Sequence, residues 1–168
     1  MAARAIAYTG DSRGEPLLRY KAHLGDKDPQ VLAECFLALL RLEPKGSVEF
    51  VAAYLESSDA ETVEAAAIAL GESRTHEALL PLQSVYSRTV GSGTRRTFLF
   101  AIAALRCDGA VEFLLGELAN AEGQTAEAIL AALATFRNDQ SVCKQVADIV
   151  DRKRDRQLAE AFRDSFRS

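Results

Sequence analysis

A similar helical sequence pattern recurs four times in this chain, and its regular spacing constrains the fold more than any other feature of the sequence. Each unit opens on an aspartate or a threonine and runs into an apolar segment. The openers are Asp28, Asp59, Thr94 and Thr125, at successive steps of 31, 35 and 31 residues. A period in this range is typical of proteins built as stacks of repeated units, because each unit buries its apolar face against its neighbours. The sequence therefore predicts a solenoid.

The first helix of each unit is predicted from its opener and from the residues behind it. Aspartate and threonine side chains accept hydrogen bonds from the free N–H groups of a first helical turn, so we expect all four openers to be N-caps. Apolar residues then recur at i, i+3, i+4 and i+7, which is one face of a helix. The predicted core columns are Leu32, Val63, Phe98, Ile129; Cys35, Ala66, Ala101, Ala132; Phe36, Ala67, Ile102, Leu133; and Leu39, Leu70, Leu105, Phe136.

A second helix follows in every unit after a short link, and such links make neighbouring helices antiparallel. Its predicted inward columns are Val48, Leu79, Val111, Val142 and Leu55, Tyr86, Leu118, Ile149. The chain is predicted to be one domain, on its length of 168 residues. The predicted full repeats span 28–57, 59–90, 94–120 and 125–154, with partial or capping units at 1–26 and 155–168.

The two partial units follow the same frame. Leu17–Leu24 lies 31 residues before Val48–Leu55 and is predicted to be the second helix of an earlier unit, with Ala3–Tyr8 as a short first helix. Leu158–Phe162 (LAEAF) resembles Leu32–Phe36 (LAECF), so we expect the first helix of a further unit there.

One stretch of the chain carries a resemblance to a known family. Ala65–Tyr86 reads AAAIALGESRTHEALLPLQSVY: an Ala-rich helix ending Ala-Leu-Gly, a short polar turn, then Glu-Ala and a Leu-rich helix. This pattern closely resembles the bacterial HEAT-like repeats, often called PBS-lyase-type HEAT-like repeats. The resemblance implies an all-α, right-handed, HEAT-like or armadillo-like α-solenoid whose second helices line a concave face. The other units depart from the pattern, with Leu40, Arg106 and Arg137 in place of the glycine.

The candidate binding residues lie on the outward face of the second helices. Taken through the repeats at 100° per residue, this face gives three rows, and the middle row is small in every unit. The rows are Arg19, Phe50, Pro81, Phe113, Lys144; Ala22, Ala53, Ser84, Gly116, Ala147; and Asp26, Ser57, Arg88, Asn120, Asp151. From these rows we select as candidate protein-binding residues Arg19, Phe50, Ala53, Ser84, Arg88, Phe113, Gly116 and Lys144.

Two interpretations of these rows remain open. The small residues form the floor of a groove flanked by Phe50 and Phe113, since exposed aromatic residues beside arginine are typical of interaction hot spots. Alternatively, the small residues let neighbouring second helices pack closely, and the two phenylalanines fill gaps between repeats.

Composition argues against several functions. A net charge of −4 and a pI near 5.3 argue against a nucleic-acid binder, which needs Lys and Arg to neutralise phosphates. The three cysteines are widely spaced and form no CxxC pair, so we expect no zinc site and reduced thiols, as in a cytoplasmic protein. No apolar run approaches the roughly 20 residues of a membrane span, so we expect no membrane partner.

No motif indicates a reaction or a cofactor. His76-Glu77 is the only His-Glu pair, whereas the HEAT-like iron hydroxylases use several such pairs, so we expect no metal site. The sequence favours a non-catalytic scaffold or adaptor that binds a protein or peptide of unknown identity. Two alternatives stay open: a bilin-lyase-like or other enzyme-associated subunit, and a fragment of a larger multidomain protein. The sequence does not predict the oligomeric state.

Overall fold

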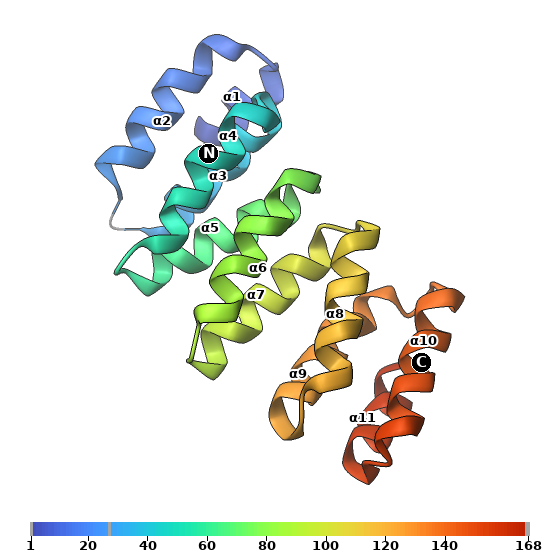
Figure 1. Cartoon of the computed structure of the whole chain (residues 1–168). Helices are drawn as coiled ribbons and strands as arrows, with labels where there is room; N and C mark the ends of the chain where they lie inside the picture. Colours follow the sequence, from blue (N-terminus) through green and yellow to red (C-terminus); the bar gives the residue numbers. More distant parts are fainter. Residues whose placement is uncertain (1, 27, 167–168) are drawn as a thin grey trace. The chain divides into compact units, whose positions relative to one another are not determined.

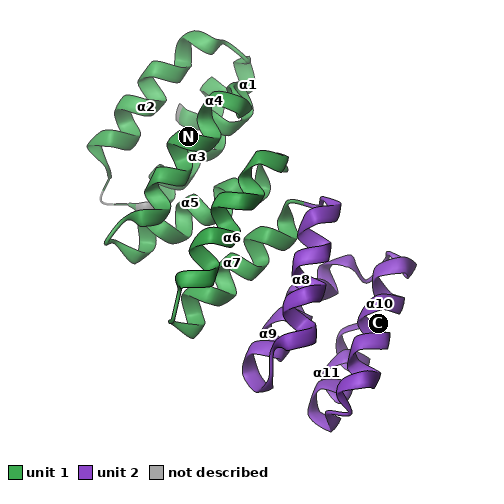
Figure 2. Cartoon of the chain, viewed as in Figure 1, with its two compact units in different colours: residues 1–105 green, residues 106–168 purple. Residues whose placement is uncertain are grey.

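The computed structural model describes residues 2–26 and 28–166, and every regular element among them is a helix (Figure 1). The predicted all-α helical-repeat class is confirmed; the right-handed sense stays a prediction. The chain divides into two compact units, residues 1–105 and 106–168, coloured green and purple in Figure 2.

Unit 1 is a stack of paired helices. Its elements are α1 (Ala2–Thr9), η1 (Ser12–Gly14), α2 (Glu15–Leu24), α3 (Pro29–Leu42), α4 (Pro44–Ala52), η2 (Ala53–Glu56), α5 (Ala60–Glu72), η3 (His76–Ala78), α6 (Leu79–Arg88) and α7 (Ser92–Ala104). The first helices form one layer, in which α1 packs on α3, α3 on α5 and α5 on α7. The second helices lie against that layer: α2 on α3, α4 on α3 and α5, and α6 on α7.

Unit 2 repeats the arrangement with fewer helices. Its elements are α8 (Asp108–Asn120), α9 (Gly123–Leu133), η4 (Ala134–Phe136), α10 (Gln140–Lys153) and α11 (Arg156–Phe166). The second helices α8 and α10 pack on each other and on α9, and α11 packs on α9 and α10. Leu158 is buried in α11, as expected for a first helix that closes on the preceding pair.

Two of the four predicted N-caps are confirmed, and two are wrong. The Asp28 carboxylate accepts a hydrogen bond from the Gln30 N–H (2.9 Å). The Asp59 carboxylate accepts one from the Thr62 N–H (3.0 Å). Thr94 and Thr125 lie inside α7 and α9, which begin two residues earlier. In both cases the residue before the helix is extended and makes no side-chain cap, so the threonine falls within the first turn.

The predicted core columns of the first helices are all buried, from Leu32 to Phe136. The second helices of the full repeats follow their predicted columns too, with Val111 half-buried and the other members buried.

The helix α2 departs from the predicted register. Ala22 is predicted to face outward, but it is buried together with Leu18 where α2 packs on α3. Because α1 ends at Thr9, the main neighbour of α2 is α3. The face of α2 that packs on α3 is therefore not the face that the repeat pattern predicts.

Gly71 marks the closest approach of two first helices. It is the buried glycine of α5, and a Cβ built on it would lie 2.4 Å from the carbonyl oxygen of Ala101 on α7. The backbone of Ala101 cannot move aside as a flexible side chain could, so this close helix–helix contact requires glycine at position 71.

Candidate protein-binding surface

The eight candidate residues all lie on second helices, but they belong to two units that are described separately. Unit 1 carries Arg19 on α2, Phe50 on α4, Ala53 on η2, and Ser84 and Arg88 on α6. Unit 2 carries Phe113 and Gly116 on α8, and Lys144 on α10. The structure therefore presents two second-helix faces, one in each unit.

The small residues of the middle row are exposed at three positions. Ala53 and Ser84 are exposed in unit 1, and Gly116 is exposed in unit 2. A Cβ added at Gly116 would meet no atom within 4 Å, so close packing does not require a glycine there. Because these side chains are short, they project little from the exposed surface of the second helices.

Phe50 is half-buried within a group of rings at the junction of α2 and α4. Its ring centroid lies 5.3 Å from that of His23 and 5.4 Å from that of Tyr54, both edge-on. The Arg19 guanidinium covers its ring at 4.6 Å. Phe50 also packs on the core formed by Leu18 and its neighbours, so it contributes to the contact between two repeats.

The two arginines of unit 1 bridge successive second helices. Arg19 pairs with Glu15 (2.6 Å) and donates to the carbonyl of Gly46 on α4 (3.0 Å). Arg88 on α6 pairs with Glu56 on η2, and its hydrogen bonds lower the pKa of the Glu56 carboxyl below its usual value. Arg19 is half-buried by its contacts, whereas the Arg88–Glu56 pair stays exposed.

In unit 2, Lys144 is exposed and Phe113 is half-buried. Lys144 makes no ion pair with any residue of the described chain.

One exposed residue on this face was not predicted from the sequence. Leu80 on α6 is 75% exposed and lies one turn before Ser84, while Leu79 and Leu82 are buried. The signal was available: Leu79, Leu80 and Leu82 fall within four residues, and one helical face cannot bury all three. Because the Arg88–Glu56 pair joins α6 to η2, Leu80, Ser84 and Ala53 belong to neighbouring helices of one face.

In the part of the chain that the structure describes, no three His, Cys, Asp or Glu side chains lie together as metal ligands, and His76 and Glu77 are exposed. Cys35 is buried, which raises the pKa of its thiol, and Cys107 and Cys143 are half-buried. Among the described helices, none has the length and apolar character of a membrane span.

Comparison with known proteins assigns a family to part of the chain. Residues 20–98 match the family model described as HEAT repeats. No curated protein matches the sequence. The matched segment runs from α2 into α7 and contains Phe50, Ala53, Ser84 and Arg88, but not Arg19.

Proposed function

We propose that this chain, whose residues 20–98 match the HEAT-repeat family model, is a non-catalytic scaffold that binds a protein or peptide through the exposed face of its second helices. HEAT repeats generally mediate protein–protein interaction, since stacked units present long surfaces formed by many helices. In unit 1 the proposed surface, here called the second-helix face, consists of Phe50, Ala53, Leu80, Ser84 and Arg88. In unit 2 its counterpart consists of Phe113, Gly116 and Lys144.

The observation that carries the proposal is the exposure of Leu80 beside small residues. A large apolar side chain in water is unfavourable, by roughly 25 cal/mol per Å² of apolar surface that a partner would cover. Ala53 and Ser84 are exposed and short, so a partner side chain has room beside Leu80. An apolar anchor with a polar rim is the usual anatomy of a binding site.

The rim of the second-helix face indicates the kind of partner. Arg88 and Glu56 form an exposed ion pair that joins α6 to η2 on this face. Exposed pairs exchange partners at little cost, so both groups can bind a carboxylate or an ammonium of the partner. The fitting partner is a peptide segment with an apolar anchor flanked by polar or charged side chains. We further propose a cytoplasmic setting, where the three free cysteines would stay reduced.

The test is affinity capture from a lysate of the source cells with three baits. The first is the wild type, the second is Leu80→Asp with Ser84→Arg, and the third is the control Val90→Asp. Val90 is an exposed apolar residue outside the second-helix face, in the link between α6 and α7. Circular dichroism first establishes that all three baits fold alike.

We expect a protein captured by the wild type and by the Val90→Asp control, and lost from the double variant. A photo-crosslinking amino acid at Ser84 should then join the bait to that protein. A partner that binds the double variant as well as the wild type contradicts the assignment of this face. Capture of no protein by any bait contradicts the scaffold function itself.

A further inference from the structure

The helix α2 carries an apolar stripe that no described element covers. Leu17, Tyr20 and Leu24 are 64%, 65% and 64% exposed, and their i, i+3, i+7 spacing places them on one face of the helix. Three large exposed side chains in a row form a contiguous apolar patch, which is uncommon on a protein surface without a partner.

The other repeats show what this stripe would normally contact. The corresponding positions of α4 and η2 are Val48, Val51 and Leu55, and all three are buried where these elements pack on the first helices. In α6 the same positions, Leu79, Leu82 and Tyr86, are buried too. The stripe of α2 is therefore a core face of the repeat, turned to solvent.

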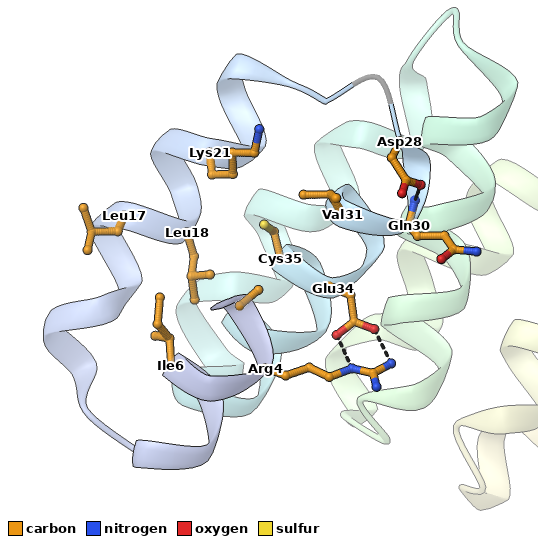
Figure 3. Close-up of a pocket in the computed structure, with 11 residues that line it drawn as sticks. Arg4, Ile6, Leu17, Leu18, Lys21, Asp28, Gln30, Val31, Glu34 and Cys35 are labelled. Atoms are coloured by element: carbon orange, nitrogen blue, oxygen red, sulfur yellow. Dashed lines mark hydrogen bonds and ion pairs between the residues drawn. The ribbon is translucent and has the colours of Figure 1, made fainter. Parts of the chain in front are cut away.

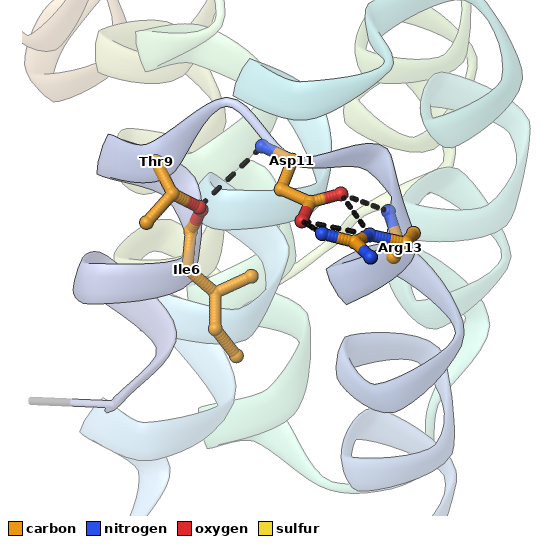
Figure 4. Close-up of polar contacts among 4 residues, drawn as sticks. All are labelled: Ile6, Thr9, Asp11 and Arg13. Carbon is orange, nitrogen blue, oxygen red and sulfur yellow. Dashed lines mark hydrogen bonds and ion pairs between the residues drawn. The ribbon is translucent and has the colours of Figure 1, made fainter.

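The turn after α1 explains why the stripe is uncovered. Gly10 adopts a φ of 66°, in the left-handed region that stops a helix. Thr9 Oγ1 accepts a hydrogen bond from the Asp11 N–H (3.4 Å), and Asp11 in turn accepts from the Arg13 N–H (3.0 Å), as Figure 4 shows. These contacts end α1 after two turns, so it is too short to cover α2.

A cavity lies beside the stripe, between α1, α2 and the start of α3. Its volume is about 610 Å³, and Ile6 and Leu18 enter it from α1 and α2 (Figure 3). Val31 and Cys35 of α3 also line it, and Leu17 lies both at this cavity and on the exposed stripe. Packing at this end of unit 1 is incomplete, and the apolar surface continues from the stripe into the cavity.

The charges around α2 favour a neutral partner surface. Arg13 pairs with Asp11, Arg19 with Glu15, and Lys21 with Asp26, the last at 2.6 Å. The pairs cancel one another's charge, so a second copy of the same face meets no like-charge repulsion.

We propose that the stripe of Leu17, Tyr20 and Leu24 is a self-association surface on which a second copy of this chain docks through its own α2. Twofold symmetry is the commonest arrangement of identical chains and pairs one surface with itself. The two α2 helices run antiparallel, so Tyr20 meets Tyr20 near the axis and Leu17 meets Leu24 of the second copy.

The size of the patch sets the strength of this dimer. The three side chains present roughly 400 Å² per copy, since a large side chain buries about 150–250 Å² when covered completely. Two such patches together bury roughly 800 Å², which is below the roughly 1,200 Å² of the smallest stable interfaces. The dimer is therefore weak and reversible, and it forms as the protein concentration rises.

The first test is sedimentation velocity on the wild type from about 1 µM to about 200 µM, a range that brackets a micromolar Kd. The variant carries Leu17→Glu and Leu24→Glu, and the control carries Val90→Glu, an exposed apolar residue in the link between α6 and α7 that lies outside both proposed surfaces. We expect a monomer–dimer equilibrium in the wild type and the control, and a monomer throughout in the variant. A wild type that stays monomeric over the range overturns the proposal.

A second test checks the geometry. The Tyr20→Cys variant should form a disulfide-linked dimer on mild oxidation, because the two introduced thiols meet at the twofold axis. The Val90→Cys variant should give only the background of the wild type. A dimer that Tyr20→Cys does not crosslink, or that the double glutamate variant leaves intact, also overturns the assignment.

Discussion

Gly71 shows how one residue sets the distance between two helices. A methyl group there would press on the backbone of Ala101, which has no alternative rotamer. We expect Gly71→Ala to lower the free energy of unfolding by about 1–3 kcal/mol, as overpacking does, despite the better helix propensity of alanine. Urea denaturation measures it. Gly116→Ala is the matched control: its Cβ meets open space, so it should stabilise by about 0.5–1 kcal/mol. A Gly71→Ala variant as stable as Gly116→Ala would refute the close approach.

Arg74 occupies a position that suits glycine. Its φ is 53°, a left-handed conformation that costs a residue with a Cβ roughly 1 kcal/mol. Arg74→Gly should therefore raise the free energy of unfolding by up to about 1 kcal/mol, partly offset by the greater flexibility of glycine in the unfolded chain. Arg106 has the same backbone conformation but covers the ring of Phe136 at 5.0 Å, so Arg106→Gly should gain less. Thermal unfolding of both variants checks the order, and a loss of stability in Arg74→Gly would contradict it.

The helix α5 begins after the N-cap residue Asp59, whose carboxyl group can be protonated. Hydrogen bonds from the Thr62 hydroxyl (2.5 Å) and N–H (3.0 Å) lower the pKa of the Asp59 carboxyl in the folded protein. A lowered folded pKa means that the cap stabilises α5 fully above the unfolded pKa of about 3.9. This stability is lost as the pH falls through the folded pKa.

Asp59→Asn keeps a capping oxygen but cannot titrate. We expect the wild type to lose stability toward acid more steeply than Asp59→Asn, so the difference between their free energies of unfolding shrinks from pH 6 to about pH 2. Glu64→Gln on the same helix serves as control, since the Glu64 side chain makes no hydrogen bond or ion pair in the described structure. A difference that stays constant with pH would show that the Asp59 cap does not depend on charge.

The elements were predicted well wherever local pattern decides them. The apolar columns of the first helices are buried as expected, because a period of 3.6 residues admits only one inward face. The register of α2 could not be predicted, although its sequence matches the frame. It depends on the length of α1, which the turn at Gly10 limits, and on how two helices then share the surface of α3. The register of α2 is therefore determined by packing between helices, and the sequence of α2 alone does not reveal it.

At the scale of the whole molecule, the repeat spacing was enough to predict the all-α repeat fold, while the candidate site was predicted only in outline. Helical periodicity placed Ala53, Ser84 and Gly116 on exposed second-helix positions. It could not reveal that Arg19 lies over Phe50, because that contact joins side chains far apart in the sequence and in two different helices. It also overlooked Leu80, whose exposure follows from competition among three leucines for one core face.

Amide hydrogen exchange on the complex with the captured protein tests whether the partner binds the second-helix face. We expect slower exchange on α4, η2 and α6 of unit 1, where this face lies, with α3 and α5 unchanged. Partner-induced protection confined to the first helices, or to the stripe of α2, would contradict it.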